Sequence, residues 1–306
     1  MRFTVQFPLD EPQLAEHAVD HGRLGEFAAT AERAGFDAIA FTEHPAPSSA
    51  WLHGPYGHAS LDPFSAAAYC AARTERLCVM PYLAVLPYRN PYVTAKAATT
   101  VDRLSGGRLV LCVGAGYLRE EFDAMNLRFS DRAAVAREAL QTMRSAWSDD
   151  NEASAPELRP RPVRAGGPRV WIGGNSARSR DDVVQHGDGW APLVVAGRLA
   201  GELGTAGLAS IDELAEALAD LRHRLLCAGR EPDSVDVQVK GPFSRVRLST
   251  FEAAAAVETV RRLEQAGVTW LVVHPEAPTR EGLLDVLERY GDAVISPTAR
   301  RTESAP

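Results

Sequence analysis

The segment Gly106–Phe122, GGRLVLCVGAGYLREEF, contains a short apolar run with a pair of glycines near each end. The apolar residues Leu109–Val113 have the length and composition of a buried parallel strand. The first glycine pair precedes this run, where glycine commonly ends a helix. The second pair, Gly114 and Gly116, follows it, and glycine there either lets the backbone approach a ligand closely or makes a simple tight turn. We favour the ligand-binding interpretation.

Strand-like and helix-like segments alternate on both sides of this run. Strands are predicted at residues 3–7, 37–44, 77–85, 109–113, 169–174, 188–193, 235–241 and 269–275. Two of the intervening helices begin with a capping residue followed by proline, at Asp62-Pro63 and at Asn90-Pro91. Eight strand–helix units predict an α/β fold, a (β/α)8 TIM barrel with insertions in the top-face loops.

The main alternative to a barrel is a doubly wound sheet that binds a dinucleotide. Its GxGxxG fingerprint should follow an early strand. The candidate here, GAGYLR at residues 114–119, comes late and lacks the third glycine. We therefore expect one barrel domain over residues 1–295 and a C-terminal tail, residues 296–306, that frays.

The composition excludes several classes of partner. The chain has 306 residues and a net charge of −7, which argues against nucleic acid or an anionic membrane as a partner. No apolar stretch approaches the roughly 20 residues of a membrane helix, and the N-terminus lacks a hydrophobic signal core. The four cysteines form no CxxC pair and no zinc-ligand spacing. We expect a cytoplasmic protein with reduced thiols, a small-molecule substrate and no metal site.

Active sites of barrels lie at the carboxyl ends of the strands, and His44 is the strongest catalytic candidate there. A histidine can donate or accept a proton near pH 7, although a lone histidine is more often structural. Glu43 is a possible partner that orients it, but adjacent strand residues point to opposite faces. His274 is equally well placed by topology. The long loop that contains Trp51 has the length of a lid.

The motif GGNSAR at residues 173–178 predicts an anion site. Gly173 and Gly174 follow a strand, and Asn175 and Ser176 lead into a helix. Free backbone N–H groups and the helix dipole favour an anion there, and Arg178 adds positive charge. The alternative is a glycine turn capped by one of the two polar residues.

Three stretches of this sequence resemble a known family. They are FTEHP at residues 41–45, LPYRNPYVTAKAATTVDRLSGGRLVLCVGAGYLREEF at 86–122, and GGNSARSRDDVVQHGDGWAP at 173–192. They resemble the bacterial luciferase-like flavin and deazaflavin oxidoreductases, and most of all the F420-dependent subgroup. The resemblance runs from Met1 to about Tyr290. The Ala-, Arg- and Asp-rich composition is also typical of high-GC actinobacteria, where F420 is common.

The resemblance implies a site for the cofactor at the barrel mouth. A bulge in the third strand, often with a non-prolyl cis peptide, backs the cofactor ring in this family. It maps to Tyr82–Val85, which includes Leu83 and Ala84. The cofactor phosphate maps to the turn at Gly173–Ser176, and the family histidine after strand two maps to His44.

One position departs from the family pattern. In the F420-dependent sugar-phosphate dehydrogenases, a catalytic glutamate directly follows the second glycine of the strand-four turn. Here that position is Tyr117, which is predicted to donate a proton or to pack on the ring. Glucose-6-phosphate oxidation is therefore not expected. The DGW motif at residues 188–190, a family hallmark, is predicted to be mainly structural.

Together these patterns predict an F420-dependent oxidoreductase that moves hydride between the deazaflavin and a small organic substrate. The resemblance also implies a homodimer. An FMN-dependent monooxygenase that uses reduced flavin and O2 stays open as an alternative, because both cofactors use the same phosphate turn. A non-catalytic flavin-binding protein is the third possibility.

Overall fold

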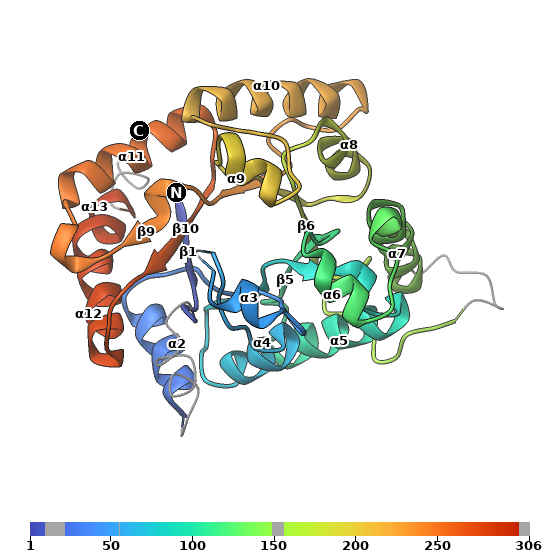
Figure 1. Ribbon diagram of the computed structural model, residues 1–306, viewed down its shortest axis with the longest axis horizontal. Helices are drawn as coiled ribbons and strands as arrows, with labels where there is room; N and C mark the ends of the chain where they lie inside the picture. Colours follow the sequence, from blue (N-terminus) through green and yellow to red (C-terminus); the bar gives the residue numbers. More distant parts are fainter. Residues whose placement is uncertain (10–21, 55, 149–155, 300–306) are drawn as a thin grey trace.

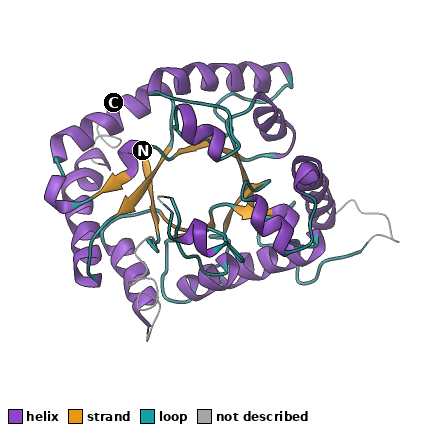
Figure 2. Ribbon diagram, viewed as in Figure 1, coloured by secondary structure: helices purple, strands orange, loops and turns teal. Residues whose placement is uncertain are grey.

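Parallel strands form a ring with helices outside it, as the computed structural model shows (Figures 1 and 2). The structure describes residues 1–9, 22–54, 56–148 and 156–299. The strands are β1 (Arg2–Gln6), β2 (Ala38–Phe41), β3 (Cys78–Pro81), β4 (Ala84–Val85), β5 (Val110–Gly114), β6 (Arg169–Gly173), β7 (Gly189–Ala191), β8 (Asp236–Val239), β9 (Arg245–Val246) and β10 (Trp270–Pro275). Their order is β3-β2-β1-β10-β8-β7-β6-β5-β4, with β9 paired to β10.

The ring closes between the third and fourth strand positions. A parallel bridge joins Val79 of β3 to Leu109, and β4 pairs with β5. β3 and β4 thus share one strand position of the barrel and are separated by Tyr82 and Leu83. The predicted (β/α)8 barrel is confirmed, and the open doubly wound sheet is excluded.

In the described residues, eight helices pack around the ring of strands. They are α2 (Arg23–Arg33), α4 (Pro63–Ala71), α5 (Pro91–Leu104), α7 (Arg132–Trp147), α8 (Ala177–His186), α10 (Ile211–Cys227), α11 (Ala253–Ala266) and α12 (Arg280–Tyr290). The predicted caps are confirmed: Asp62 accepts the Ser65 N–H at 2.8 Å and Asn90 accepts the Tyr92 N–H at 3.0 Å. Proline follows each cap at the start of its helix.

Short helices lie in the loops that follow the strands. They are α3 (Ser49–Leu52), α6 (Arg119–Ala124) and α9 (Gly197–Glu202), which Figure 1 places inside the outer ring of helices. At the other end of the chain, α12 continues through a π-helical turn into α13 (Ser296–Ala299), so the first residues of the predicted frayed tail are helical. The rest of that tail, residues 300–306, lies outside the described residues. No helix in the described residues has both the length and the apolarity needed to cross a membrane.

The interior of the barrel is filled with side chains. One hydrophobic cluster lies between the strands and the outer helices. A second, smaller cluster alternates with it along the strands and includes Ala40, Met80, Cys112 and Trp171. The interior also contains buried polar side chains that are hydrogen-bonded to each other. Thr4 Oγ1 donates to Gln238 Oε1 at 2.5 Å. A barrel packed in this way leaves its strand ends and loops as the place for chemistry.

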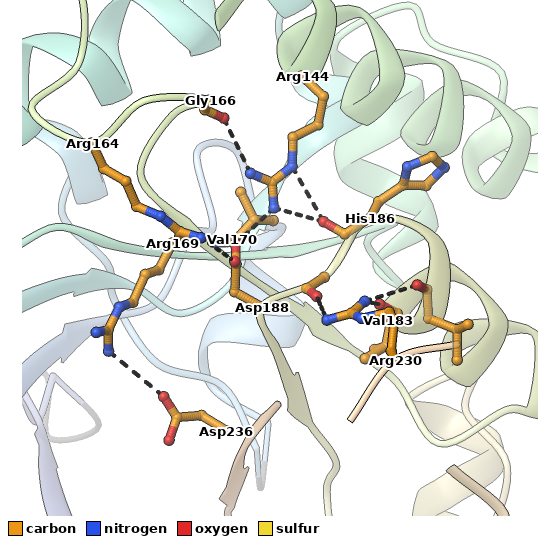
Figure 3. A network of polar contacts seen from close by, with 12 residues as sticks. Arg144, Arg164, Gly166, Arg169, Val170, Val183, His186, Asp188, Arg230 and Asp236 are labelled. Atoms are coloured by element: carbon orange, nitrogen blue, oxygen red, sulfur yellow. Dashed lines mark hydrogen bonds and ion pairs between the residues drawn. The ribbon is translucent and has the colours of Figure 1, made fainter. Parts of the chain in front are cut away.

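A polar network around Asp188 fixes the start of β7 (Figure 3). Asp188 Oδ2 accepts from Arg144 Nη2 at 2.7 Å and from the Val170 N–H at 3.0 Å, and its Oδ1 accepts from Arg164 Nη2 at 2.9 Å. Arg144 also donates to the carbonyl of His186, at the end of α8. The network joins α7, β6 and α8, as expected for a DGW motif with a structural role.

Candidate active site

His44 lies at the carboxyl end of β2, held by its backbone and by a ring contact. Its N–H donates to Ser60 Oγ at 2.8 Å, and the Ser60 hydroxyl donates back to the His44 carbonyl at 3.1 Å. Its ring packs on the Trp51 ring, with 4.4 Å between centroids. The side chain is only 8% exposed. The imidazole is therefore largely shielded from solvent, so its neighbours decide how it is used.

Three other polar side chains join His44 in a row, which we call the His44 chain: Tyr88, Glu121, His44 and Tyr117. Tyr88 Oη donates to Glu121 Oε2 at 2.8 Å, and the same oxygen lies 3.3 Å from His44 Nδ1. On the other side of the ring, Tyr117 Oη lies 3.4 Å from His44 Nε2. The two predicted catalytic residues thus lie together. Sequence reasoning missed the role of Glu121, because its partners Tyr88 and His44 lie 33 and 77 residues away in the chain.

Glu43 does not orient His44, so that part of the sequence hypothesis is wrong. Glu43 Oε2 accepts the Val85 N–H at 2.6 Å, and its carboxylate pairs with Arg89. Arg89 in turn donates to Asp62 at 2.9 Å. The cause is the alternation that sends adjacent extended residues to opposite sides. Burial raises the pKa of Glu43 despite the opposing charge of Arg89.

The predicted bulge in the third strand is present between β3 and β4, and the Tyr82–Leu83 peptide bond is cis. The Leu83 side chain lies against the ends of both β5 and β6. A Cβ added to Gly114 or to Gly173 would lie 2.7 Å from Leu83 Cδ1. Both glycines are therefore needed for packing against Leu83. Ala84 is buried and pairs with Val113 of β5. The cofactor contacts assigned to these residues stay predictions.

The glycines around β5 have two different structural functions. Before the strand, Gly107 has a φ of +89° and its N–H donates to the Asp102 carbonyl at 2.8 Å, which ends α5 as predicted. After the strand, Gly116 has a φ of +78°. A Cβ there would lie 2.7 Å from Val85 Cγ1 and 3.1 Å from the Phe122 ring. The turn after β5 is thus packed against the bulge and α6.

The predicted phosphate turn begins α8. Ser176 caps the helix by accepting the Ser179 N–H at 3.0 Å, and Arg178 is exposed. The Asn175 side chain donates to the carbonyls of Leu193 and Ala206 at 2.8 and 2.9 Å. Both amide hydrogens of Asn175 are therefore engaged with neighbouring loops. The phosphate contact predicted for Asn175 stays a prediction, and its observed contacts are structural.

Gly174 is a poor position for testing this turn. It has a φ of +109°, which β-branched residues avoid. A Cβ there would also lie 2.7 Å from Ser179 Oγ, which bonds the capping Ser176 hydroxyl at 2.8 Å. A bulky substitution would disturb the start of the helix as well as any ligand. Arg178, exposed and outside these contacts, is the better position.

Because Leu83 packs on Gly114, we expect the effects of substitutions at these two positions on stability to be coupled. Gly114→Ala should lower the free energy of unfolding by about 1–2 kcal/mol, because its Cβ would meet Leu83. In a Leu83→Ala background the same change should cost almost nothing. Urea unfolding of the four proteins measures the coupling. Gly201→Ala, where no atom lies within 4 Å of the added Cβ, is the control. Additive effects would contradict the contact.

The arrangement defines a class of protein: a TIM barrel with a buried cluster of titratable side chains at the carboxyl ends of its strands. The Luciferase-like monooxygenase family model matches residues 1–267, and this chain belongs to that family. Its solved relatives include the monooxygenase RslO1 from Streptomyces bottropensis, with a TM-score of 0.73 and 16% identity over 97% of this chain and 100% of that one. At this identity the likeness shows a shared fold.

Three curated relatives differ in their named activities. The phthiodiolone/phenolphthiodiolone dimycocerosates ketoreductase of Mycobacterium kansasii is 28% identical over 69% of this chain and 59% of its own length. The F420-dependent glucose-6-phosphate dehydrogenase of Amycolatopsis mediterranei is 34% identical over 42% of this chain and 38% of its own. The FMNH(2)-dependent dimethylsulfone monooxygenase of Pseudomonas putida is 27% identical over 53% and 46%.

The named activities of these relatives differ within one family. The chain spans about half the length of the curated relatives it matches. Their names include both an F420-dependent and an FMNH(2)-dependent enzyme. The chain is therefore a member of a family of oxidoreductases and monooxygenases that use either cofactor.

Proposed function

We propose that this protein is an F420-dependent oxidoreductase that moves hydride between the deazaflavin and a small organic substrate. The observation that carries the proposal is the His44 chain, in which a buried imidazole lies between Glu121 Oε2 and Tyr117 Oη. Hydride transfer to a carbonyl leaves charge on the oxygen, which a positioned proton donor neutralises. The bound deazaflavin would supply the hydride, and it reacts poorly with oxygen because carbon replaces the oxygen-reactive ring nitrogen.

The residues present fit such a cofactor at two places. The turn at the start of α8 offers backbone N–H groups of a first helical turn and the exposed guanidinium of Arg178, a donor set suited to a phosphate. The nearby acids are already paired, Asp181 with Arg224 and Asp182 with Arg137. At the barrel mouth, the bulge at Leu83 offers an apolar surface for a ring.

We expect F420 to bind at least ten times more tightly than FMN, a difference of about 1.4 kcal/mol. Calorimetric titration of the protein with each cofactor measures this difference. Arg178→Ala should weaken the binding of either cofactor, because both carry a phosphate. Arg289→Ala removes an exposed arginine from the outer helix α12 and is the matched control.

The titration also discriminates between the alternatives. Equal or inverted affinities would favour an FMN-dependent monooxygenase, which the FMNH(2)-dependent relative makes the second candidate. Tight binding without turnover of carbonyl, alcohol or imine substrates would favour a flavin-binding protein without catalytic activity. If Arg178→Ala bound both cofactors as tightly as the wild type, Arg178 would not contact the phosphate. The choice between F420 and FMN would still be decided by the titration of the wild type.

A further inference from the structure

Glu121 is a fully buried carboxylate with three donors around it. Its Oε2 accepts from Tyr88 Oη at 2.8 Å and faces His44 Nδ1 at 3.3 Å, and its Oε1 accepts the Ala46 N–H at 3.3 Å. The side chain is 1% exposed. Its neighbour Glu120 accepts the Ser48 N–H at 2.9 Å. Both acids therefore hold the loop after β2, but only Glu121 faces the imidazole.

The partners of Glu121 determine which nitrogen of His44 carries the proton. A carboxylate accepts hydrogen bonds and has no proton to donate. His44 Nδ1 must therefore be the donor in its contact with Glu121. In the neutral ring this leaves a lone pair on Nε2, which faces Tyr117 Oη at 3.4 Å. The hydroxyl of Tyr117 is then the donor to His44.

We infer that Glu121 is a positioning residue that keeps the proton of His44 on Nδ1 and directs its Nε2 to Tyr117, so that substrate protons pass through Tyr117. This inference rests on the proposed function for its chemistry. In alcohol oxidation, the substrate hydroxyl gives its proton to Tyr117 Oη while the Tyr117 proton passes to His44 Nε2. The two electrons would leave the substrate carbon as hydride, which the deazaflavin would take up when bound. Reduction of the carbonyl reverses each transfer.

The surroundings of the His44 chain suit this assignment. Burial and the charge of Glu121 raise the pKa of Tyr117, so the phenol keeps its proton at neutral pH. Tyr117 therefore gives its proton to His44 only when it receives a proton from the substrate. When the imidazole gains the second proton, its positive charge lies beside Glu121. The rings of Trp51 and His58 also lie beside the imidazole, with 4.4 and 4.9 Å between ring centroids.

Glu121→Gln changes the hydrogen bonds without changing the size of the side chain. The amide oxygen should face the Ala46 N–H, which cannot turn, whereas the Tyr88 hydroxyl can rotate and become an acceptor. The amide nitrogen then faces His44 and donates to Nδ1. The proton of His44 should therefore move to Nε2, which blocks acceptance of the Tyr117 proton.

The test is the ¹⁵N spectrum of the imidazole in the cofactor-free protein, with the His44 signals assigned by their loss in His44→Ala. In the wild type, Nδ1 should be the protonated nitrogen, and in Glu121→Gln it should become the unprotonated one. Glu120→Gln, with the same loss of charge on the same helix, should leave the His44 signals unchanged. An unprotonated Nδ1 in the wild type would overturn the inference, and so would an unaltered Nδ1 in Glu121→Gln.

Turnover provides the second readout. Glu121→Gln should lower kcat about 10²-fold or more with KM within about threefold, because the wrong tautomer stops the proton transfer. Glu120→Gln should stay within about threefold of the wild-type kcat. The spectra need no cofactor, so failure to bind F420 would defeat the proposed function and leave the positioning role standing. Normal turnover of Glu121→Gln with F420 would defeat the positioning role alone.

Discussion

Replacing His44 with alanine should lower kcat about 10²–10⁴-fold, which is roughly 3–5 kcal/mol of activation free energy. The imidazole is the only histidine ring of the described residues within hydrogen-bonding reach of both Glu121 and Tyr117, so its removal interrupts the His44 chain. The affinity for F420 should change by less than about tenfold. Steady-state kinetics and calorimetry measure the two quantities separately.

The control for this prediction is His53→Ala. His53 lies in the same loop, but it is exposed and bonds the Ser49 carbonyl at 2.7 Å instead of the His44 chain. We expect its kcat to stay close to that of the wild type. A His44→Ala protein that turns over at nearly the wild-type rate would show that His44 is structural, and Tyr117 would be the next residue to test.

Replacing Asp188 with asparagine should lower the free energy of unfolding at pH 7 by about 3 kcal/mol. The change removes the charge that two arginines, Arg144 and Arg164, approach within 3 Å (Figure 3). The amide N–H of asparagine would also face an N–H donor, either of an arginine or of Val170, so one hydrogen bond would be lost. Urea unfolding measures the loss. Asp233→Asn is the control: its side chain is 90% exposed and pairs with the half-exposed Arg222 at 3.6 Å, so the change should stay within about 0.5 kcal/mol.

The effect of Asp188 should depend on pH in a defined direction. Burial alone would raise its pKa, but the bonds from Arg144, the Val170 N–H and Arg164 hold the pKa below its usual value. The stabilisation is therefore complete above the unfolded-state pKa of about 3.9 and is lost as the pH falls through the lower folded-state value. The difference between wild type and Asp188→Asn should be constant near neutral pH and shrink in acid. A difference that grows below pH 4 would contradict this assignment.

The sequence predicted the barrel well because its signals are local. Asp62 and Asn90 bond the N–H groups of their own helices, and the glycines after α5 end that helix through contacts a few residues away. The alternation of apolar runs with amphipathic helices then leaves few topologies. The break at Tyr82 and Leu83 was predicted from family resemblance, because residues 77–85 were predicted as one strand although Pro81, which ends β3, lies within them.

The pairing within the site could not be predicted in the same way. Glu121 stands next to Glu120 in the sequence, and a run of two acids at the start of a short helix usually faces solvent. Its burial depends on Tyr88 and His44, which are 33 and 77 residues away. The packing reason for Gly114 and Gly173 could not be predicted either, since both contact Leu83, which lies in the break between β3 and β4.

The neighbouring residues Glu43 and His44 face different parts of the protein, one toward Arg89 and Val85 and the other toward Glu121 and Tyr117. The number of residues between β2 and Pro45 therefore decides which side chain faces which group. Insertion or deletion of one residue there would present the imidazole to the arginine and the carboxylate to a second carboxylate. Variation in loop length among relatives of this protein should then be tolerated after His44 and be suppressed before it.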